Sequence, residues 1–203
     1  MSILSFAGNK VLTTGEGGAV LVNSKKLYEK LKLIRSHGRQ INSNYFHTTK
    51  TPNYISLGYN WRMSSMTAAL GISQLRKLET LISKRRKNSI YLSSKLKKCS
   101  EITLPLDYKN HKNVFQLYTI RIRGKNLRNN LMKFLEKRGI MSKIFFEPVH
   151  LSKFYSKNMN KKISLPVTEK ISQQVLTLPM YPNLTKNEIN FISDTINEFF
   201  ETL

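Results

Sequence analysis

One lysine near the start of the chain has neighbours that could give its amine a chemical role. Lys10 ends the segment SFAGNK (residues 5–10), and two β-prone runs follow it, separated by GEGG (residues 15–18). The GEGG segment predicts a tight reversal between two strands, which would place Lys10 at the edge of a sheet. A desolvated amine attacks a carbonyl carbon and forms a Schiff base. A surface lysine that enters a hairpin fits the same spacing.

Two further residues stand where a ligand could be bound. Asn60 lies in GYNWRMS (residues 58–64), directly before a helix for which Ser64 is the expected N-cap. Backbone amides at such a helix start favour anions; the alternative is that Asn60 stabilises an irregular loop. His150 ends FFEPVH (residues 145–150), where it either contacts a ligand or bonds within its own loop. No second His or Cys stands at ligand spacing, so we expect no metal site.

Composition indicates a folded, cytoplasmic protein. The chain has 203 residues, of which 40% are hydrophobic and 10% aromatic, enough to bury a core. Its single cysteine, Cys99, excludes an intrachain disulfide and indicates a reducing compartment. No apolar run approaches the length needed to span a bilayer, and no signal-peptide pattern begins the chain, so we expect no membrane association.

The charge is strongly basic. Thirty-four Lys and Arg against twelve Asp and Glu give a net charge of +22, which favours polyanionic partners in general. The basic residues are spread along amphipathic segments, with short clusters at 84–87 and 95–98, rather than gathered in one arm. Solvated helix faces or a positive cleft for a nucleoside diphosphate explain this distribution. We therefore expect no nucleic-acid partner.

Helix signals dominate the first half of the chain. Ser24 is the expected N-cap of a helix that ends near His37 and Gly38. Residues 39–57 show no periodicity and predict a long loop. A second helix should follow Ser64 and continue to about Lys97, with a bend or break at 83–86.

The second half alternates strand and helix signals. Strands are expected at 114–122 and 143–146, with an extended segment at 176–182. Helices are expected at 127–138, ended by Gly139, at 168–175, and at 186–200, where Thr185 and Glu188 form a capping box. Together these elements predict a small α/β domain.

Three segments in this order carry a family resemblance: SFAGNKVLTTGEGG (residues 5–18), GYNWRMS (residues 58–64) and FFEPVH (residues 145–150). They resemble the DegT/StrS-type sugar-nucleotide aminotransferases, and perosamine-synthase-like members above all. These are fold-type I enzymes that use pyridoxal 5′-phosphate (PLP) to aminate keto sugars carried on a nucleoside diphosphate. The resemblance implies an α/β fold in which residues 1–83 form the C-terminal part of the PLP-binding large domain. Residues 84–203 would form the small C-terminal α/β domain.

The resemblance also implies site residues. Lys10 would bind PLP covalently, Ser5 would contact its phosphate, and Asn60 would reach across a dimer interface to the neighbour's PLP phosphate. His150 would contact the sugar nucleotide. Departures from the family pattern are Trp61 in place of tyrosine, Gln116 in place of histidine and Lys143 in place of arginine. The last two are expected to alter which sugar or amino donor is accepted.

Other elements of the family site lie N-terminal to these segments, namely the phosphate-binding turn, the aromatic residue that stacks on PLP and the aspartate that pairs with its ring nitrogen. We therefore expect the C-terminal half of an enzyme of surface-polysaccharide biosynthesis that forms a homodimer and needs an N-terminal-half polypeptide. Its substrates would be a nucleotide sugar and an amino donor, glutamate. The alternatives are a non-catalytic remnant or interaction subunit that pairs with a full-length homologue, and a basic nucleic-acid-binding protein. The sequence leaves open which keto sugar is used and whether the 3- or 4-position is aminated.

Overall fold

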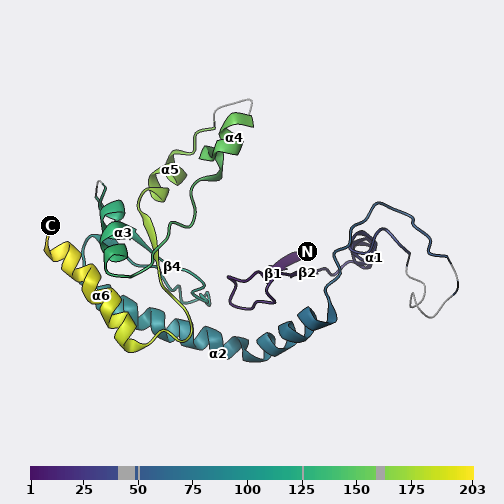
Figure 1. Cartoon of the computed structure of the whole chain (residues 1–203), viewed down its shortest axis with the longest axis horizontal. Coiled ribbons are helices and arrows are strands. Elements are labelled where there is room, and N and C mark those ends of the chain that lie inside the picture. Colours follow the sequence, from purple (N-terminus) through teal and green to yellow (C-terminus); the bar gives the residue numbers. More distant parts are fainter. Residues whose placement is uncertain (41–48, 50, 125, 159–162) are drawn as a thin grey trace. The chain divides into compact units, whose positions relative to one another are not determined.

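A computed structural model describes residues 1–40, 49, 51–124, 126–158 and 163–203 (Figure 1). The chain divides into two compact units, an N-terminal unit of residues 1–78 and a C-terminal unit of residues 79–203. Helix α2 (Ser65–Leu96) runs from the first unit into the second.

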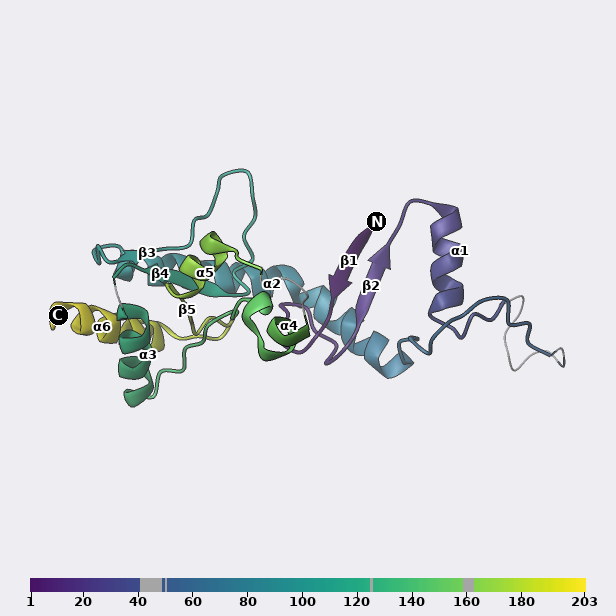
Figure 2. The same cartoon turned by 90° about the horizontal axis from the view of Figure 1, so that it is seen from above.

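The N-terminal unit begins with a two-stranded antiparallel hairpin (Figure 2). Strand β1 (Ser2–Ser5) pairs with β2 (Gly18–Leu21), so that Ser5 lies opposite Gly18. The predicted reversal at 15–18 is therefore wrong. β2 pairs with β1, and residues 6–17 form a long loop that carries Lys10.

Helix α1 (Lys25–Ile34) follows and has the predicted caps. The hydroxyl of Ser24 accepts a hydrogen bond from the N–H of Leu27 at 3.4 Å. At the other end the N–H of Gly38 donates to the carbonyl of Leu33 at 2.8 Å, and Gly38 takes a left-handed φ of 70°. Of the predicted 39–57 loop, residues 41–48 and 50 lie outside the described residues.

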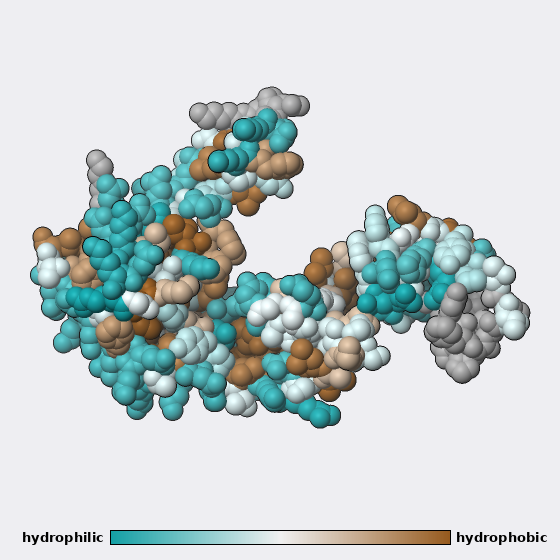
Figure 3. Space-filling model, viewed as in Figure 1, coloured by the Kyte–Doolittle hydropathy of each residue, from teal (hydrophilic) through white to brown (hydrophobic). Residues whose placement is uncertain are grey.

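Helix α2 starts as predicted, because the hydroxyl of Ser64 accepts a hydrogen bond from the N–H of Thr67 at 3.1 Å. It continues without interruption through 83–86, where the sequence indicated a bend or break. Apolar side chains reach the surface along its first turns, including Met66, Ile72 and Leu75 (Figure 3). Of the helices that the structure describes, none is both long enough and apolar enough to cross a bilayer.

The C-terminal unit is built on a three-stranded antiparallel sheet with the order β3-β4-β5. The strands are β3 (Ile102–Thr103), β4 (Tyr118–Ile122) and β5 (Val175–Leu178). Along β4 the side chains of Tyr118, Ile120 and Ile122 are fully buried and alternate with partly exposed ones, as expected for a sheet with one covered face. Burial raises the pKa of Tyr118 to about 12, although its hydroxyl bonds that of Ser93 at 2.7 Å.

Two helices and the end of α2 cover this sheet. Helix α3 (Leu127–Lys137) contributes Leu131 and Leu135 to the core, and α6 (Lys186–Glu201) contributes Ile189 and Ile196. α6 runs beside the C-terminal part of α2, where the hydroxyl of Tyr91 donates to Asn190 at 2.8 Å (Figure 1). The predicted helix at 127–138 and its glycine stop at Gly139, with φ 75°, are confirmed.

Both predicted strands of this unit are longer than the observed ones. β4 begins at Tyr118 rather than 114, because Phe115 has a left-handed φ of 45° and its N–H bonds the side chain of Asn113 at 2.9 Å. Of 143–146 only one isolated bridge remains, between Lys143 and Thr177.

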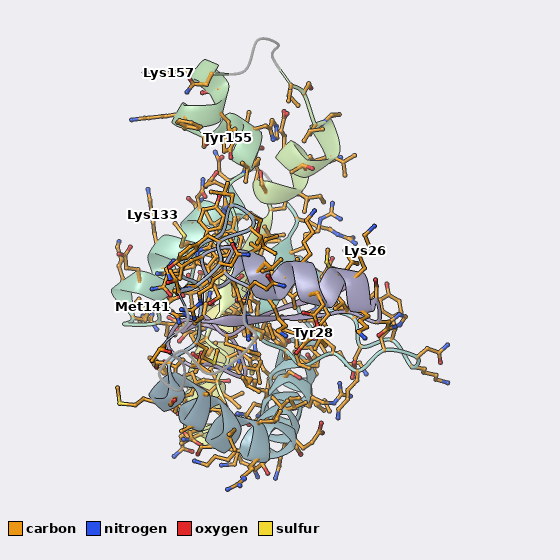
Figure 4. The ribbon with its side chains drawn as sticks, turned by 90° about the vertical axis from the view of Figure 1, so that its right-hand side faces the viewer. Lys26, Tyr28, Lys133, Met141, Tyr155 and Lys157 are labelled. Atoms are coloured by element: carbon orange, nitrogen blue, oxygen red, sulfur yellow. The ribbon has the colours of Figure 1, made fainter. Side chains whose placement is uncertain are left out.

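An arm of short helices follows that bridge. It contains a 3-10 turn, η2 (Val149–Leu151), then α4 (Lys153–Asn158) and α5 (Pro166–Ser172). Figure 4 labels Tyr155 and Lys157 on α4. α5 lies slightly earlier than the predicted helix at 168–175, because Val175 already belongs to β5.

The basic cluster at 84–87 is only partly a solvated surface. One guanidinium nitrogen of Arg85 donates to the carbonyls of Phe115, Gln116 and Met180 at 3.1, 3.3 and 2.7 Å, and burial lowers the pKa of Arg85. Arg86 pairs with Asp107 at 2.7 Å. These cations stabilise the fold of the C-terminal unit, so they are not free to bind a polyanion.

Hydrophobic burial is uneven between the two units. Among the described residues, every buried hydrophobic side chain lies between Ile82 and Phe199. In the N-terminal unit the strand residues Ile3 and Leu21 are 75% and 55% exposed, and α1 has no buried residue. An isolated two-stranded hairpin is marginally stable in water, and the described part of the N-terminal unit adds no buried hydrophobic side chain to support it.

The capping box of α6 gives a first prediction. The hydroxyl of Thr185 accepts from the N–H of Glu188 at 3.2 Å, and the Glu188 carboxylate accepts from the N–H of Thr185 at 2.7 Å. Thr185→Ala is expected to lower the free energy of unfolding of the C-terminal unit by about 1 kcal/mol. Urea unfolding followed by far-ultraviolet circular dichroism measures this change. Thr185→Ser keeps the acceptor and should retain the wild-type midpoint; an unchanged midpoint for the alanine variant would contradict the prediction.

Candidate active site

Lys10 lies in a loop whose two ends are tied together by backbone hydrogen bonds. The N–H of Phe6 donates to the carbonyl of Gly17, and the N–H of Thr14 donates to the carbonyl of Phe6, both at 2.9 Å. Within the loop the N–H of Lys10 closes a turn on the carbonyl of Ala7 at 3.0 Å. The Lys10 residue is half-buried. The backbone position of Lys10 is therefore held by the hydrogen bonds of this loop.

Thr14 anchors this loop on the start of α2. Thr14 is buried, and its hydroxyl donates to the carbonyl of Glu16 at 2.7 Å. Gly17 has φ 149°, and a Cβ there would lie 2.7 Å from the Thr14 hydroxyl and 3.0 Å from a methyl of Met63. A Cβ on Gly71 of α2 would lie 3.0 Å from the Thr14 methyl. Small residues thus allow the Lys10 loop to pack tightly at this point.

Ser5 is placed near this loop by the hairpin register. It is the last residue of β1 and lies opposite Gly18, the first residue of β2, so it stands at the hairpin end from which the loop emerges. Ser5 is exposed. The structure therefore brings Ser5 and the Lys10 loop to the same end of one hairpin.

Asn60 lies in an extended segment that pairs with the backbone after α1. The N–H of Tyr59 donates to Ile34 at 2.6 Å, the N–H of His37 donates to Tyr59 at 2.9 Å, and the N–H of Trp61 donates to Arg35 at 2.9 Å. These three backbone bonds surround Asn60 on both sides. They hold its Cα in place although the residue is exposed.

Two glycines permit this pairing. A Cβ on Gly58 would overlap the backbone nitrogen of Gly38, and a Cβ on Gly38 would overlap the carbonyl oxygen of Ser56. Because the obstructing atoms are backbone, no side chain can move aside to make room. The glycine of GYNWRMS is thus required for two chain segments to touch.

The side chains around Asn60 form two pairs. Arg62 donates to the Asn60 amide oxygen from Nε at 3.2 Å and from Nη2 at 3.1 Å. Tyr59 and Trp61 stack with ring centroids 4.2 Å apart and an interplanar angle of 6°. The hydrogen bonds of Asn60 and those of Lys10 belong to separate segments of the N-terminal unit. Arg62 and Thr14 were not singled out from the sequence, although an Asn-x-Arg spacing in an extended segment signals such a contact.

His150 belongs to the C-terminal unit, where it has a partner of its own. Its Nε2 lies 3.0 Å from a carboxylate oxygen of Glu169, and its side chain is only 7% exposed. The same oxygen accepts from the N–H of Leu165 at 2.8 Å. His150 therefore links η2 to the start of α5.

The C-terminal unit also contains a cavity of about 290 Å³ at the end of β4 and β5. Its walls are largely apolar, and its polar lining residues are Thr177, Gln116 and Lys143. Gln116 and Lys143 are both positions at which the sequence departs from the family pattern. The full lining is Gln116, Leu117, Met141, Lys143, Phe145, Thr177, Leu178, Pro179 and Met180.

The model of the DegT/DnrJ/EryC1/StrS aminotransferase family matches residues 1–197. A GDP-perosamine synthase of Escherichia coli O157:H7 is 30% identical over 203 residues, which cover 98% of this chain and 52% of that protein. The chain thus spans about half the length of the curated relatives it matches.

Solved structures show the same fold. Helicobacter pylori PseC, an aminotransferase involved in the biosynthesis of pseudoaminic acid, has a TM-score of 0.89 at 28% identity, over 99% of this chain and 53% of PseC. S. venezuelae DesV, solved in complex with a ketimine intermediate, has a TM-score of 0.85 at 29% identity, over 99% of this chain and 52% of DesV. The α/β fold described above is that of the C-terminal portion of these enzymes.

Proposed function

Since this chain belongs to the DegT/DnrJ/EryC1/StrS aminotransferase family, whose members depend on PLP, we propose that it is the C-terminal half of a sugar-nucleotide aminotransferase. It would transfer an amino group from glutamate to a keto sugar carried on a nucleoside diphosphate. The observation that carries the proposal is the half-buried Lys10 in a loop tied at both ends. The names of the relatives support this class of substrate.

The donors of the N-terminal unit fit an aldehyde that carries a phosphate group. Lys10 offers an amine, which can bond the aldehyde carbon covalently. Ser5 and Asn60 offer a hydroxyl and an amide N–H pair, both suited to phosphate oxygens. Gly17 of the loop and Gly71 of α2 keep side chains out of the space beside Thr14. We assign the cofactor contacts to Lys10, Ser5 and Asn60, with Asn60 acting across a homodimer interface as the family pattern implies.

Lys10 would also be the catalytic base. Bound PLP would supply an electron sink that makes a C–H bond of the amino donor acidic. The amine of Lys10 would take that proton from the donor carbon and return a proton later, as general base and then general acid. His150 and the cavity residues Gln116 and Lys143 would contact substrate. For His150 this requires that it exchange its bond with Glu169.

The uneven core supports the need for a second polypeptide. The strands of the hairpin expose Ile3, Leu4 and Leu21, and the first turns of α2 expose Met66 and Leu75. Burial of such surface stabilises by about 25 cal/mol per Å². We propose that an N-terminal-half polypeptide covers this surface and supplies the remaining cofactor contacts. A full-length homologue covering the same surface would make this chain a non-catalytic interaction subunit, the second candidate function.

Covalent capture of PLP separates these two functions. The chain is combined with the N-terminal half of the E. coli relative, incubated with a low concentration of PLP and reduced with borohydride, and its peptides are analysed by mass spectrometry. Lys10 should carry the label in preference to Lys25, an exposed lysine on α1 that serves as the matched control. Equal labelling of both lysines, with a folded complex present, would remove Lys10 from the cofactor role and favour the non-catalytic subunit.

A further inference from the structure

Asn60 and Arg62 form a pair whose geometry determines what the asparagine can offer a ligand. In an extended segment, residues two apart point to the same side. Here the Nε and Nη2 of Arg62 both donate to the amide oxygen of Asn60, at 3.2 and 3.1 Å. A guanidinium has only donors, so the amide must turn its oxygen to Arg62. Its nitrogen, with two N–H donors, is then directed away from the guanidinium.

The backbone beneath the pair is held as well. Hydrogen bonds of Tyr59, Trp61 and His37 fix the segment on both sides of Asn60. The Nη2 of Arg62 also lies 3.5 Å from Nε2 of His37, so the guanidinium sits between two partners. Backbone and side chain are thus ordered before any ligand arrives.

We propose that Arg62 is a positioning residue that holds the Asn60 amide with its N–H donors outward, toward the phosphate group of the cofactor. The inference rests on the proposed role of Asn60 in phosphate binding. An unrestrained amide also samples the flipped orientation, which presents a carbonyl oxygen to an anion. When Arg62 holds the Asn60 amide in the donor orientation, phosphate binding is stronger, because a preorganised group loses less conformational freedom when the ligand binds.

In a competing explanation, Arg62 contributes only its positive charge. In that case lysine would replace it without loss, because an ammonium keeps the charge. A lysine ammonium is a compact point charge and lacks the planar fork that holds one acceptor with two nitrogens. Arg62→Lys therefore separates orientation from charge.

The test uses the full chain, labelled with ¹⁵N and combined with the unlabelled N-terminal half of the E. coli relative as in the capture experiment, with inorganic phosphate and PLP as probes. The side-chain amide resonances of Asn60 are followed by NMR during each titration, and the backbone spectrum reports whether the variant keeps its fold. Arg62→Lys should raise the apparent Kd for phosphate about tenfold, the equivalent of one hydrogen bond to a charged group. Arg76→Lys, an exposed and charge-matched change on α2, should leave the Kd unchanged.

A double-mutant cycle shows whether Arg62 acts through Asn60. Asn60→Ala should also weaken phosphate binding about tenfold, and adding Arg62→Lys to it should have no further effect, because coupled residues are not additive. Wild-type affinity in Arg62→Lys, or additive losses in the double variant, would overturn the positioning role. Failure of the Asn60 resonances to respond to phosphate would also overturn it, while labelling of Lys10 by PLP would still support the aminotransferase proposal. Coupled losses without Lys10 labelling would support the positioning role and contradict the aminotransferase.

Discussion

Lys10→Ala is expected to reduce amino transfer by about 10²–10⁴-fold, the usual contribution of a positioned general acid–base group. Lys10 would act twice in each half-reaction, as the group that removes a proton and as the group that returns one. Loss of the amine removes both actions while leaving the loop intact, because the backbone bonds of Phe6, Thr14 and Gly17 do not involve the side chain. The rate is measured as 2-oxoglutarate formed from glutamate by the chain combined with an N-terminal half.

Two comparisons make this result specific. Lys25→Ala removes an exposed lysine of the same unit and should leave the rate unchanged. Added methylamine should restore part of the rate of Lys10→Ala, because a small free amine can act as the missing base. If the alanine variant turned over as fast as the wild type, the base would have to be another residue.

Gly58→Ala is expected to disrupt the N-terminal unit at the backbone pairing that holds Asn60. The new Cβ would overlap the backbone nitrogen of Gly38, where only movement of a whole segment gives relief. Overpacking of this kind costs up to about 3 kcal/mol, and here the cost falls on the pairing that holds Asn60. The N–H groups of Tyr59 and Trp61, which donate to Ile34 and Arg35, should exchange with deuterium about 100-fold faster.

Gly8→Ala is the matched control for this prediction. A Cβ on Gly8 would lie 3.6 Å from the carbonyl oxygen of Gly15, an ordinary contact. Its exchange rates at Tyr59 and Trp61 should equal those of the wild type. Retained protection of both N–H groups in Gly58→Ala would show that the two segments do not touch as described.

Helix ends were predictable from the sequence because their causes are local. Ser24, Ser64 and Thr185 each accept a hydrogen bond from an N–H three residues later, so the signal and the structure lie within one turn. The helix stop at Gly139 is likewise predictable from the neighbouring residues alone. The resemblance to the DegT/StrS-type aminotransferases is confirmed by the family match and by the fold of PseC and DesV.

Strand partners were harder to predict than helix ends, because they depend on residues far apart in the chain. Residues 11–14 have strand-forming side chains, yet β2 pairs with residues 2–5 instead. The hydroxyl of Thr13 bonds the carbonyl of Phe6 at 3.2 Å and that of Thr14 bonds Glu16, so both threonines stabilise a loop. Strand propensity does not predict which segment pairs with β2, because the pairing depends on which backbone groups find hydrogen-bond partners.

In the candidate site, too, local motifs were predictable and contacts between distant residues were not. Sequence motifs indicated Lys10, Ser5, Asn60 and His150, because each stands in a recognisable segment. The partner of His150, Glu169, is 19 residues away in the sequence, and no local pattern connects them. Close approach of Gly38 and Gly58 is also invisible without the fold, because the obstructing atoms belong to the opposite segment.

In the part of the chain that the structure describes, the hydrophobic core is confined to residues 82–199, and this bears on how much of the chain a cell can maintain. Exposed apolar surface of the kind carried by the hairpin and α2 is recognised by chaperones and proteases. Under the proposed pairing, copies made in excess of their complement would be degraded from the N-terminal unit. The abundance of the complementary polypeptide would then set the abundance of this one, without any dedicated regulator.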